Sequence, residues 1–574
     1  MAGSDMGGLR PLYAARWLLA ALLLIVGGWG LAAWTQTRGD VSVSDIRFRA
    51  ADGTTLSALL YQPRAATAQT PAPGILAVHG YINTRETQSP FAIEFARRGY
   101  VVLALDQRGH GYSGGAATKD GFGGPDGLAY LRSLPFVDRA NIGLEGHSMG
   151  GWTVLAAAAA HPDWYRAMVL EGSSTGAPYA REGTPGWPRN LAVVYSRYDE
   201  FAPLMWGVPA ARLVGDSAKL RALFGTAAPV APGRLYGDVA AGTARLLLTP
   251  VATHPGDHLS TAAVGDAVGW FARTLRGGWP IPPGDQIWWG KEAGTGWALL
   301  GLAALTFGLF DLLLGLPRYA ALRRPVTDRR TARDGRWWGL WWLTTLVPPL
   351  TFYLALLVLP PPIPPSALFP QAITNWLVVW AVGNTVLALL FGRLLRGEQA
   401  AWAPARWALA LPLAIVVVAV LYLVIAVGAL IPLDARFWVV ALRPLDGRQA
   451  LACLAYLLPF LAFVAVAFRG AAALARHARS AAGGYLSAAG ALAAGFLLLT
   501  GGQYLALFAT GHLPLAFEAL NAIVAIQFVP LLAGLGVLAV YTERRTGSYL
   551  PGALIGGLFV TWYVVAGTAT HYAG

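Results

Sequence analysis

The sequence predicts an α/β domain with a mostly parallel sheet, fused to a membrane domain of many apolar helices. Two observations predict this architecture. Between residues 41 and 277, short apolar and β-branched runs alternate with helical patterns, as in sheets covered by helices on both faces. Most of the remaining chain consists of apolar segments of about 18 or more residues, long enough to cross a bilayer. With 55% hydrophobic and 13% charged residues among 574, the chain is too apolar to be disordered.

The charge distribution supports this division of the chain. The formal net charge is +13, which would suit a nucleic-acid partner if the basic residues lay on one polar surface. Residues 35–292 contain 23 Lys or Arg and 21 Asp or Glu, whereas the rest of the chain contains 20 and 9. The excess positive charge therefore lies between the apolar segments, which is typical of membrane proteins. We expect membrane lipids, and no nucleic acid, as partners.

The first apolar segment covers residues 17–34 and follows a short N-terminus, residues 1–16, that is predicted to be cytoplasmic. The apolar core of a cleavable signal peptide is shorter, about 7–15 residues, so we expect an uncleaved transmembrane anchor. Cleavage stays open as an alternative, because the segment ends in small residues.

The α/β domain is expected over residues 41–277. It opens with an antiparallel hairpin over residues 46–61 that turns at Asp52-Gly53. Apolar strands follow at residues 74–79, 100–106, 141–145, 167–170, 191–195 and 245–249. Helical patterns lie at residues 90–98, 124–133, 151–161 and 261–275. Because these strands lack polar alternation, they predict a parallel sheet that is buried on both faces.

A linker over residues 278–296, rich in Gly, Pro and Trp, leads to an eight-helix transmembrane domain at residues 297–571. Its apolar segments are residues 297–316, 338–359, 373–392, 407–430, 449–468, 485–507, 520–541 and 552–571. With the N-terminal anchor they make about nine crossings. The segments before residue 35 and after residue 292 contain 20 basic residues. If the N-terminus is cytoplasmic, 17 of these 20 lie on the cytoplasmic side of the membrane. The positive-inside rule therefore places the α/β domain on the extracytoplasmic face of the cell membrane.

The sharpest local pattern is G-H-S-M-G at residues 146–150, between a predicted strand and a helix of small residues. In a nucleophile elbow, a serine occupies a strained strand-to-helix turn, and glycines two positions away on either side let neighbouring backbone pass close by. Ser148 is therefore the predicted nucleophile. A serine hydroxyl needs a histidine base and an acid that orients the histidine.

The acid and the base are expected later in the chain, each just after a strand. Asp199 follows the strand at 191–195 and is preferred over its neighbour Glu200, because the acid usually stands at the outlet of the strand. His258 follows the strand at 245–249 and is preferred over His254, because a hydrophobic residue and a helix come directly after it.

An oxyanion hole is expected from two backbone N–H groups. One belongs to Met149, directly after the nucleophile, and the other to Tyr81, in the turn after the strand at 74–79. The short apolar stretch after Asp199, at Phe201, Leu204, Met205 and Trp206, is interpreted as an acyl pocket, a bilayer-facing surface or ordinary packing.

Three motifs in order resemble the α/β-hydrolase superfamily: H-G at residues 79–80, D-Q-R-G-H-G-Y-S at 106–113 and G-H-S-M-G at 146–150. The resemblance covers about residues 42–276 and is nearest to the serine aminopeptidase-like, monoglyceride-lipase-like and dienelactone-hydrolase-like branches. It implies the hydrolase fold but no particular substrate, because this fold hosts many reactions. The membrane half resembles no family known to us.

The leading hypothesis is a membrane-anchored serine hydrolase, an esterase, lipase or peptidase, that acts on a small or lipidic ester or amide. Two alternatives remain: a transporter or sensor with an inactive hydrolase-like domain, and an acyltransferase that uses the same triad. Only residues 175–190 separate two strands where many lipases insert a cap, so we expect a shallow site that is not capped by its own domain.

No cofactor or metal is expected. Cys453 has no partner cysteine, and no His or Cys cluster has the spacing of metal ligands. The G-x-G-x-x-G match at residues 109–114 lies inside a hydrolase motif and opens no helix, which argues against a nucleotide site. Asp311, within an apolar segment, is either functional or paired with Arg318 near the membrane surface.

Overall fold

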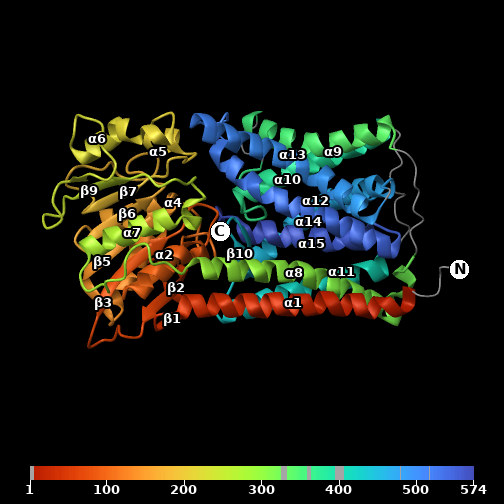
Figure 1. Ribbon diagram of the computed structural model, residues 1–574, viewed down its shortest axis with the longest axis horizontal. Helices are drawn as coiled ribbons and strands as arrows, with labels where there is room; N and C mark the ends of the chain where they lie inside the picture. The colour runs from red at the N-terminus through yellow and green to blue at the C-terminus, as the bar shows by residue number, and fades with distance from the viewer. Residues whose placement is uncertain are drawn as a thin grey trace.

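The computed structural model describes residues 6–324, 333–358, 363–394, 406–478, 480–515 and 518–573. Figure 1 shows two parts placed end to end along the long axis of the molecule, the α/β domain and a bundle of long helices. The C-terminus lies at the junction of the two parts, and the N-terminus lies at the far end of the bundle. The predicted fold class is confirmed. Parts of two predicted segments, residues 1–5 and residue 359, lie outside the described residues.

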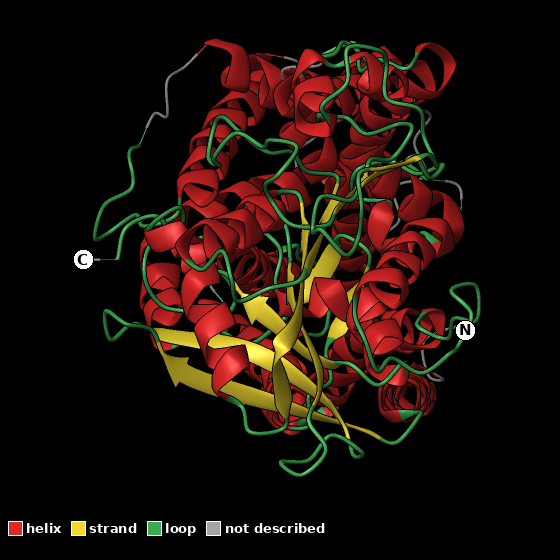
Figure 2. Ribbon diagram, turned by 90° about the vertical axis from the view of Figure 1, so that its left-hand side faces the viewer, coloured by secondary structure: helices red, strands yellow, loops and turns green. Residues whose placement is uncertain are grey.

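A nine-stranded sheet forms the α/β domain, in the order β1-β2-β4-β3-β5-β6-β7-β9-β8. Its strands are β1 (Val41–Arg49), β2 (Thr55–Pro63), β3 (Ala72–Val78), β4 (Val101–Asp106), β5 (Val137–His147), β6 (Ala167–Glu171), β7 (Leu191–Val194), β8 (Leu235–Tyr236) and β9 (Arg245–Leu248). β1 and β2 form the predicted antiparallel hairpin, and the strands from β4 to β9 in this order pair in parallel. Figure 2, seen from this end, shows the strands fanning out in a twisted sheet.

Helices cover both faces of this sheet. They are α2 (Ser89–Arg97), α3 (Gly124–Ser133), α4 (Met149–Ala160), α5 (Ala202–Trp206), α6 (Ala218–Phe224) and α7 (Thr261–Thr274). Alternate residues of β3 belong to two cores: Leu76 packs in the core that contains α3 and α4, and Ile75 in the core that contains α2 and α7. Burial on both faces explains why the strands are apolar throughout.

Two boundaries differ from the prediction in a way that affects function. β5 starts at Val137 because its first residues pair with Ala72 and Pro73 of β3, and it runs on to His147. α4 begins at Met149, two residues before the predicted start. Ser148 is therefore the single residue between a strand and a helix.

The bundle contains nine long helices among the described residues. They are α1 (Met6–Thr37), α8 (Trp289–Gly315), α9 (Gly335–Val358), α10 (Ala372–Leu394), α11 (Trp407–Leu430), α12 (Gly447–Arg476), α13 (Ala481–Thr510), α14 (Ala519–Thr546) and α15 (Leu550–Gly567). All except α9 are long and apolar enough to cross a membrane, and α9 lies against α10 and α13. α8 begins at Trp289, so the end of the predicted linker is helical.

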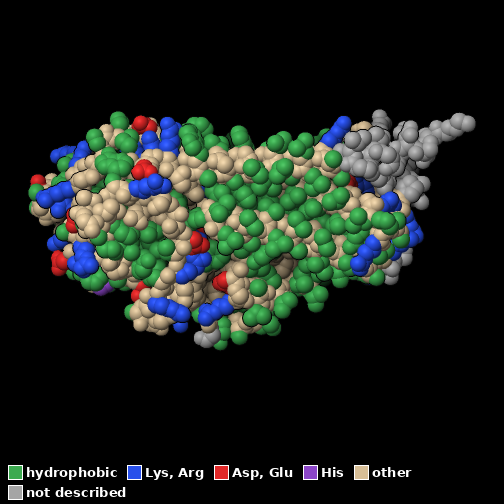
Figure 3. Space-filling view, turned by 90° about the horizontal axis from the view of Figure 1, so that it is seen from below, with side chains coloured by type: hydrophobic (Ala, Val, Ile, Leu, Met, Phe, Trp, Pro, Cys, Tyr) green, Lys and Arg blue, Asp and Glu red, His purple; other side chains and the backbone are tan. Residues whose placement is uncertain are grey.

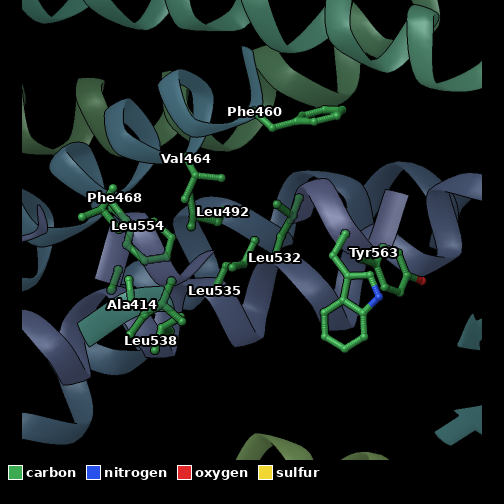
Figure 4. Packing of buried hydrophobic residues seen from close by; sticks show 14 of the residues in the cluster. Ala414, Phe460, Val464, Phe468, Leu492, Leu532, Leu535, Leu538, Leu554 and Tyr563 are labelled. Carbon is green, nitrogen blue, oxygen red and sulfur yellow. The ribbon is translucent and has the colours of Figure 1, made fainter. Parts of the chain in front are cut away.

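The surface of the bundle is suited to lipid. Leu451, Leu454 and Leu458 of α12 are 69–74% exposed, which would be unfavourable in water and is favourable against acyl chains. Figure 3 shows apolar side chains along the bundle and basic side chains at its far end. Inside the bundle, Phe468 of α12 and Leu535 of α14 belong to one apolar core, part of which is drawn in Figure 4. The protein is thus a multi-pass membrane protein.

Glycines let the N-terminal helix α1 and the helix α8 pack closely. A Cβ added to Gly294 would lie 2.4 Å from the carbonyl oxygen of Gly28, and the reverse contact is equally short. Gly301 and Gly308, spaced seven residues apart on α8, make similar approaches to α1. Small residues at such crossings allow the backbone contact that holds helices together in lipid. α1 is therefore built into the bundle.

Asp311 is paired, but not with Arg318. Its carboxylate accepts hydrogen bonds from Arg545 Nε (2.6 Å) and Tyr541 Oη (2.6 Å), both on α14. The pair links α8 to α14 at the bundle end remote from the α/β domain, because Arg545 lies in the last turn of α14. The pairing observed for Asp311 is structural.

Candidate active site

The loop at Ser148 has the geometry of a nucleophile elbow. Ser148 has φ 55° and ψ −122°, which is unfavourable for a residue with a side chain and must be held by its surroundings. Its backbone N–H donates to the carbonyl oxygen of Glu171 at 2.8 Å. A Cβ on Gly146 would lie 2.3 Å from the carbonyl oxygen of Gly150, and one on Gly150 would lie 2.1 Å from that of Val78. Both glycines of the motif are thus required by the turn.

Asp199 is paired with His254. The Nδ1 atom of His254 lies 2.8 Å from Asp199 Oδ2, and both side chains are buried. The other carboxylate oxygen of Asp199 accepts hydrogen bonds from the N–H of Phe201 (2.8 Å) and from Tyr195 Oη (3.1 Å). These contacts fix the orientation of the carboxylate. Burial lowers the pKa of His254, but the charge and hydrogen bond of Asp199 outweigh burial and raise that pKa above its usual value.

The predicted partner of Asp199, His258, lies elsewhere. His258 is in a short 3₁₀ turn at Asp257–Leu259, and neither ring nitrogen has a hydrogen-bond partner among the described residues. Its ring packs edge-on against Phe91 and lies 4.2 Å from the ring of His147. Burial therefore lowers the pKa of His258 well below its usual value. The structure brings His254, and not His258, to the acid.

The register of the sheet explains this difference. Beyond the ends of β7 and β9, the backbone continues to pair, and Tyr198 and Thr253 form a parallel bridge. The Tyr198 N–H donates to the carbonyl oxygen of Ala252 at 3.0 Å. Asp199 follows Tyr198 and His254 follows Thr253, so Asp199 and His254 face each other at the edge of the sheet. A comparison of the two histidines in the sequence alone does not reveal this register.

Glu200, the sequence alternative for the acid, has another partner. Its Oε2 accepts a hydrogen bond from the backbone N–H of His254 at 2.7 Å, and its Oε1 accepts one from Tyr504 Oη of α13, also at 2.7 Å. Burial, together with the neighbouring Asp199, raises the pKa of Glu200 to about 7. Glu200 therefore links the histidine loop to a membrane helix.

Ser148, Met149, Tyr81 and His254 line one cavity of about 560 Å³. Gly80 passes close to the nucleophile, because a Cβ added there would lie 3.1 Å from Ser148 Cβ. The volume is within the range of small-molecule sites, about 300–1,000 Å³. His258 and His147 also reach this cavity. Four of the five predicted site residues, Tyr81, Ser148, Met149 and His258, thus line this cavity, and the fifth, Asp199, contacts its wall through His254.

The cavity is roofed by the membrane domain. Its wall includes residues of the hairpin between β10 (Ala435–Phe437) and β11 (Val440–Leu442), of α14 and of α15, together with His571 near the C-terminus. Trp438 Nε1 donates to the carbonyl oxygen of Pro255 at 2.7 Å, and Tyr81 Oη lies 3.0 Å from His571 Nε2. The expectation of a shallow site is wrong, because a cap comes from residues far away in the chain.

The apolar stretch after Asp199 divides between two roles. Phe201, Leu204 and Met205 line the cavity, and the ring of Phe201 lies 4.6 Å from that of His254. Trp206 is 2% exposed and packs in the core of the α/β domain. Three of the four residues thus form an apolar wall beside Ser148 and His254.

Part of the chain is similar to known proteins. Residues 69–200 match the family described as serine aminopeptidase, S33. The α/β domain belongs to the α/β-hydrolase superfamily. A monoacylglycerol lipase of Mycolicibacterium smegmatis is 31% identical to this chain over 189 aligned residues, and the match covers 30% of this chain and 60% of the lipase.

Two further proteins are similar to the hydrolase domain. A thiohydrolase of Aspergillus aculeatus is 31% identical over 134 residues, 22% of this chain and 40% of that protein. An esterase of Pyrococcus furiosus has 17% identity and a TM-score of 0.30, and the match covers 42% of this chain and 94% of the esterase. The chain thus spans less than two thirds of the two relatives that are 31% identical.

Proposed function

We propose that the protein is a membrane-anchored serine hydrolase that cleaves an ester or amide through an acyl-enzyme. The observation that carries the proposal is that the strained Ser148 lines the same cavity as His254, which is paired with Asp199. His254 takes the place of His258 as the base in this proposal, because it is the histidine in contact with the acid.

The reaction follows from the orientation of His254. Its Nδ1 faces Asp199, so Nε2 is the nitrogen that accepts the proton of Ser148 as the Oγ attacks the substrate carbonyl. Asp199 holds the required tautomer and stabilises the imidazolium. The proton then passes to the leaving oxygen or nitrogen, and the bond to the acyl carbon breaks. Water, deprotonated by His254, cleaves the acyl-enzyme and releases the acid.

The developing oxyanion is expected to lie between the N–H groups of Met149 and Tyr81. Met149 is the first residue of α4, where the partial positive charge of the helix end favours an anion. Loss of one such donor costs about 3–4 kcal/mol of transition-state stabilisation in other enzymes. Both residues line the cavity beside Ser148, which supports this assignment.

The orientation proposed from the sequence is supported by the positions of the basic residues. Arg544 and Arg545 lie in the last turn of α14, and Arg476 lies in the last turn of α12. Figure 3 shows basic side chains at the bundle end away from the hydrolase domain. The positive-inside rule places that end in the cytoplasm and the hydrolase domain outside. The names of the two curated relatives, a lipase and a thiohydrolase, support an acyl ester or thioester as the type of bond cleaved.

Activity-based labelling tests the proposal. A fluorophosphonate probe should label the full-length protein, Ser148→Ala should abolish labelling, and the exposed control Ser133→Ala should not change it. A membrane-impermeant probe on intact cells tests sidedness at the same time. Labelling that persists in Ser148→Ala would refute the nucleophile, and labelling only after permeabilisation would refute the orientation.

A further inference from the structure

Two buried arginines from the membrane domain lie in the wall of the catalytic cavity. Arg436 is 2% exposed and Arg443 is 7% exposed. Both line the cavity that contains Ser148. Among the described residues of this wall there is no Asp or Glu, so its fixed formal charges are both positive.

The hydrogen bonds of Arg443 go to neutral groups. Its Nε donates to the carbonyl oxygen of Ala566 at 2.8 Å, and its Nη2 donates to that of Gly111 at 2.5 Å and to Gln449 Oε1 at 3.3 Å. The guanidinium also lies over the ring of Tyr112, 5.0 Å from its centroid. The Nη1 atom is buried and has no hydrogen-bond partner among the described residues. A buried N–H group without an acceptor is costly, and more so on a charged group.

Arg436 is better compensated than Arg443. Its Nη2 forms an ion pair with the buried Glu292 and donates to the carbonyl oxygen of Glu86 at 3.1 Å. Its Nη1 donates to the carbonyl oxygen of Trp438 at 3.3 Å, while its Nε has no partner among the described residues. The carboxylate of Glu86 itself is occupied by Arg85 and Thr84. Among the described residues, Arg436 is thus ion-paired with a carboxylate, whereas the hydrogen bonds of Arg443 go only to neutral groups. One N–H group of each arginine has no partner among these residues.

The wall of the same cavity includes residues of the bundle. They include Leu520, Ile523 and Gln527 of α14, positions that extend over about 10 Å of helix. Ile523 of α14 and Phe201 and Met205 of the hydrolase domain add apolar surface. A ligand that fills this cavity thus needs an apolar chain and an anionic group.

We propose that the substrate is an anionic amphiphile: an ester with an acyl chain along α14 and a phosphate or carboxylate group bound by Arg443, with help from Arg436. This inference rests on the proposed hydrolase function and adds the charge of the substrate to it. An anion beside these two guanidinium groups would gain a favourable charge interaction in a wall that contains no described Asp or Glu. A neutral monoacylglycerol would gain no such interaction.

The test compares three esters of the same acyl chain with the full-length protein in detergent. They are a neutral 1-monoacylglycerol, a lysophosphatidylglycerol and an O-acyl lactate, which carry no charge, a phosphate and a carboxylate. We expect kcat/KM to be about 10-fold or more higher for at least one anionic ester. Preference for the phosphate or for the carboxylate ester identifies the anion. No preference for either anionic ester would overturn the proposal.

Variants of the arginine test the site itself. Arg443→Gln should lower the ratio of anionic to neutral kcat/KM about 10-fold or more, and Arg443→Lys should restore part of it. Arg245→Gln is the matched control. Arg245 is also buried, donates only to carbonyl oxygens and is the first residue of β9, at the end of the strand away from His254. An unchanged ratio in Arg443→Gln would overturn the assignment of Arg443.

Two measurements keep the test decisive. The first measures how much ester protects Ser148 of the unaltered protein from a fluorophosphonate probe, and this result does not depend on the folding of a variant. Protection should need at least 10-fold less anionic ester than neutral ester. Equal protection by both would overturn the proposal. Absence of Ser148-dependent labelling would instead refute the hydrolase function, so the two failures are distinguishable.

Discussion

The two histidines near Asp199 give the most direct test of the site. His254→Ala removes the only side chain that pairs with Asp199 Oδ2 among the described residues and leaves Ser148 without a base. In well-studied triads the loss of histidine lowers kcat about 10⁴- to 10⁶-fold, or about 5–8 kcal/mol of transition-state stabilisation. His258→Ala removes a ring whose nitrogens have no hydrogen-bond partner in the part of the chain that the structure describes, and we expect a loss of at most about 10-fold from altered packing.

The assay is hydrolysis of a p-nitrophenyl acyl ester by the full-length protein in detergent, together with the rate constant of fluorophosphonate labelling. Thermal unfolding of both variants separates loss of chemistry from loss of fold. The reasoning is refuted if His258→Ala abolishes turnover while a folded His254→Ala retains it, because the acid–base pair would then differ from the observed one.

Three other predictions follow from the same contacts. The pKa of His254 is raised above 6.5, so kcat/KM should fall on acidification with a midpoint above pH 6.5, as the base becomes protonated. Glu200→Gln removes a neighbouring carboxyl group that ionises near pH 7 and should lower that midpoint. Gly150→Ala should lower the free energy of chemical unfolding by about 3 kcal/mol or more, because the added Cβ would clash with backbone. Gly284→Ala places its Cβ in open space and should have little effect. Equal unfolding of the two variants would contradict this account of the elbow. Gly294→Ile should lower the thermal stability of the protein in detergent, because the larger side chain separates α1 from α8. Gly383→Ile should not, because a Cβ at Gly383 meets no neighbour within 4 Å. Unchanged stability in Gly294→Ile would argue against the close crossing.

Much of the site was predictable from the sequence, because its signals are local. A Cβ on Gly146 would lie 2.3 Å from Gly150 within the turn, and one on Gly150 would lie 2.1 Å from Val78 of β3, so the two glycines indicate a turn packed close to its neighbours, as the motif predicts. The acid at Asp199 follows from its place directly after a strand. The parallel sheet follows from strands that are apolar on both faces. Each of these inferences needs only a few neighbouring residues.

The histidine that pairs with Asp199 could not be identified from neighbouring residues in the sequence. His254 and His258 are four residues apart, and both follow the same strand. The bridge between Tyr198 and Thr253, which are 55 residues apart in the chain, places His254 opposite Asp199. Features next to each histidine favoured His258, because they describe the following helix and carry no information about the register between two strands.

By itself, the sequence determined that this protein has a hydrolase domain with a serine elbow and a set of apolar helices. Only the tertiary structure decided that these parts share one cavity. Arg443 lies 295 residues after Ser148 in the chain, and its hydrogen bond to Gly111 spans 332 positions. Contacts over such distances depend on how whole domains pack, and no periodicity or short motif records that packing. The composition of the membrane helices indicates lipid, whereas their placement shows that they also form the roof of the site.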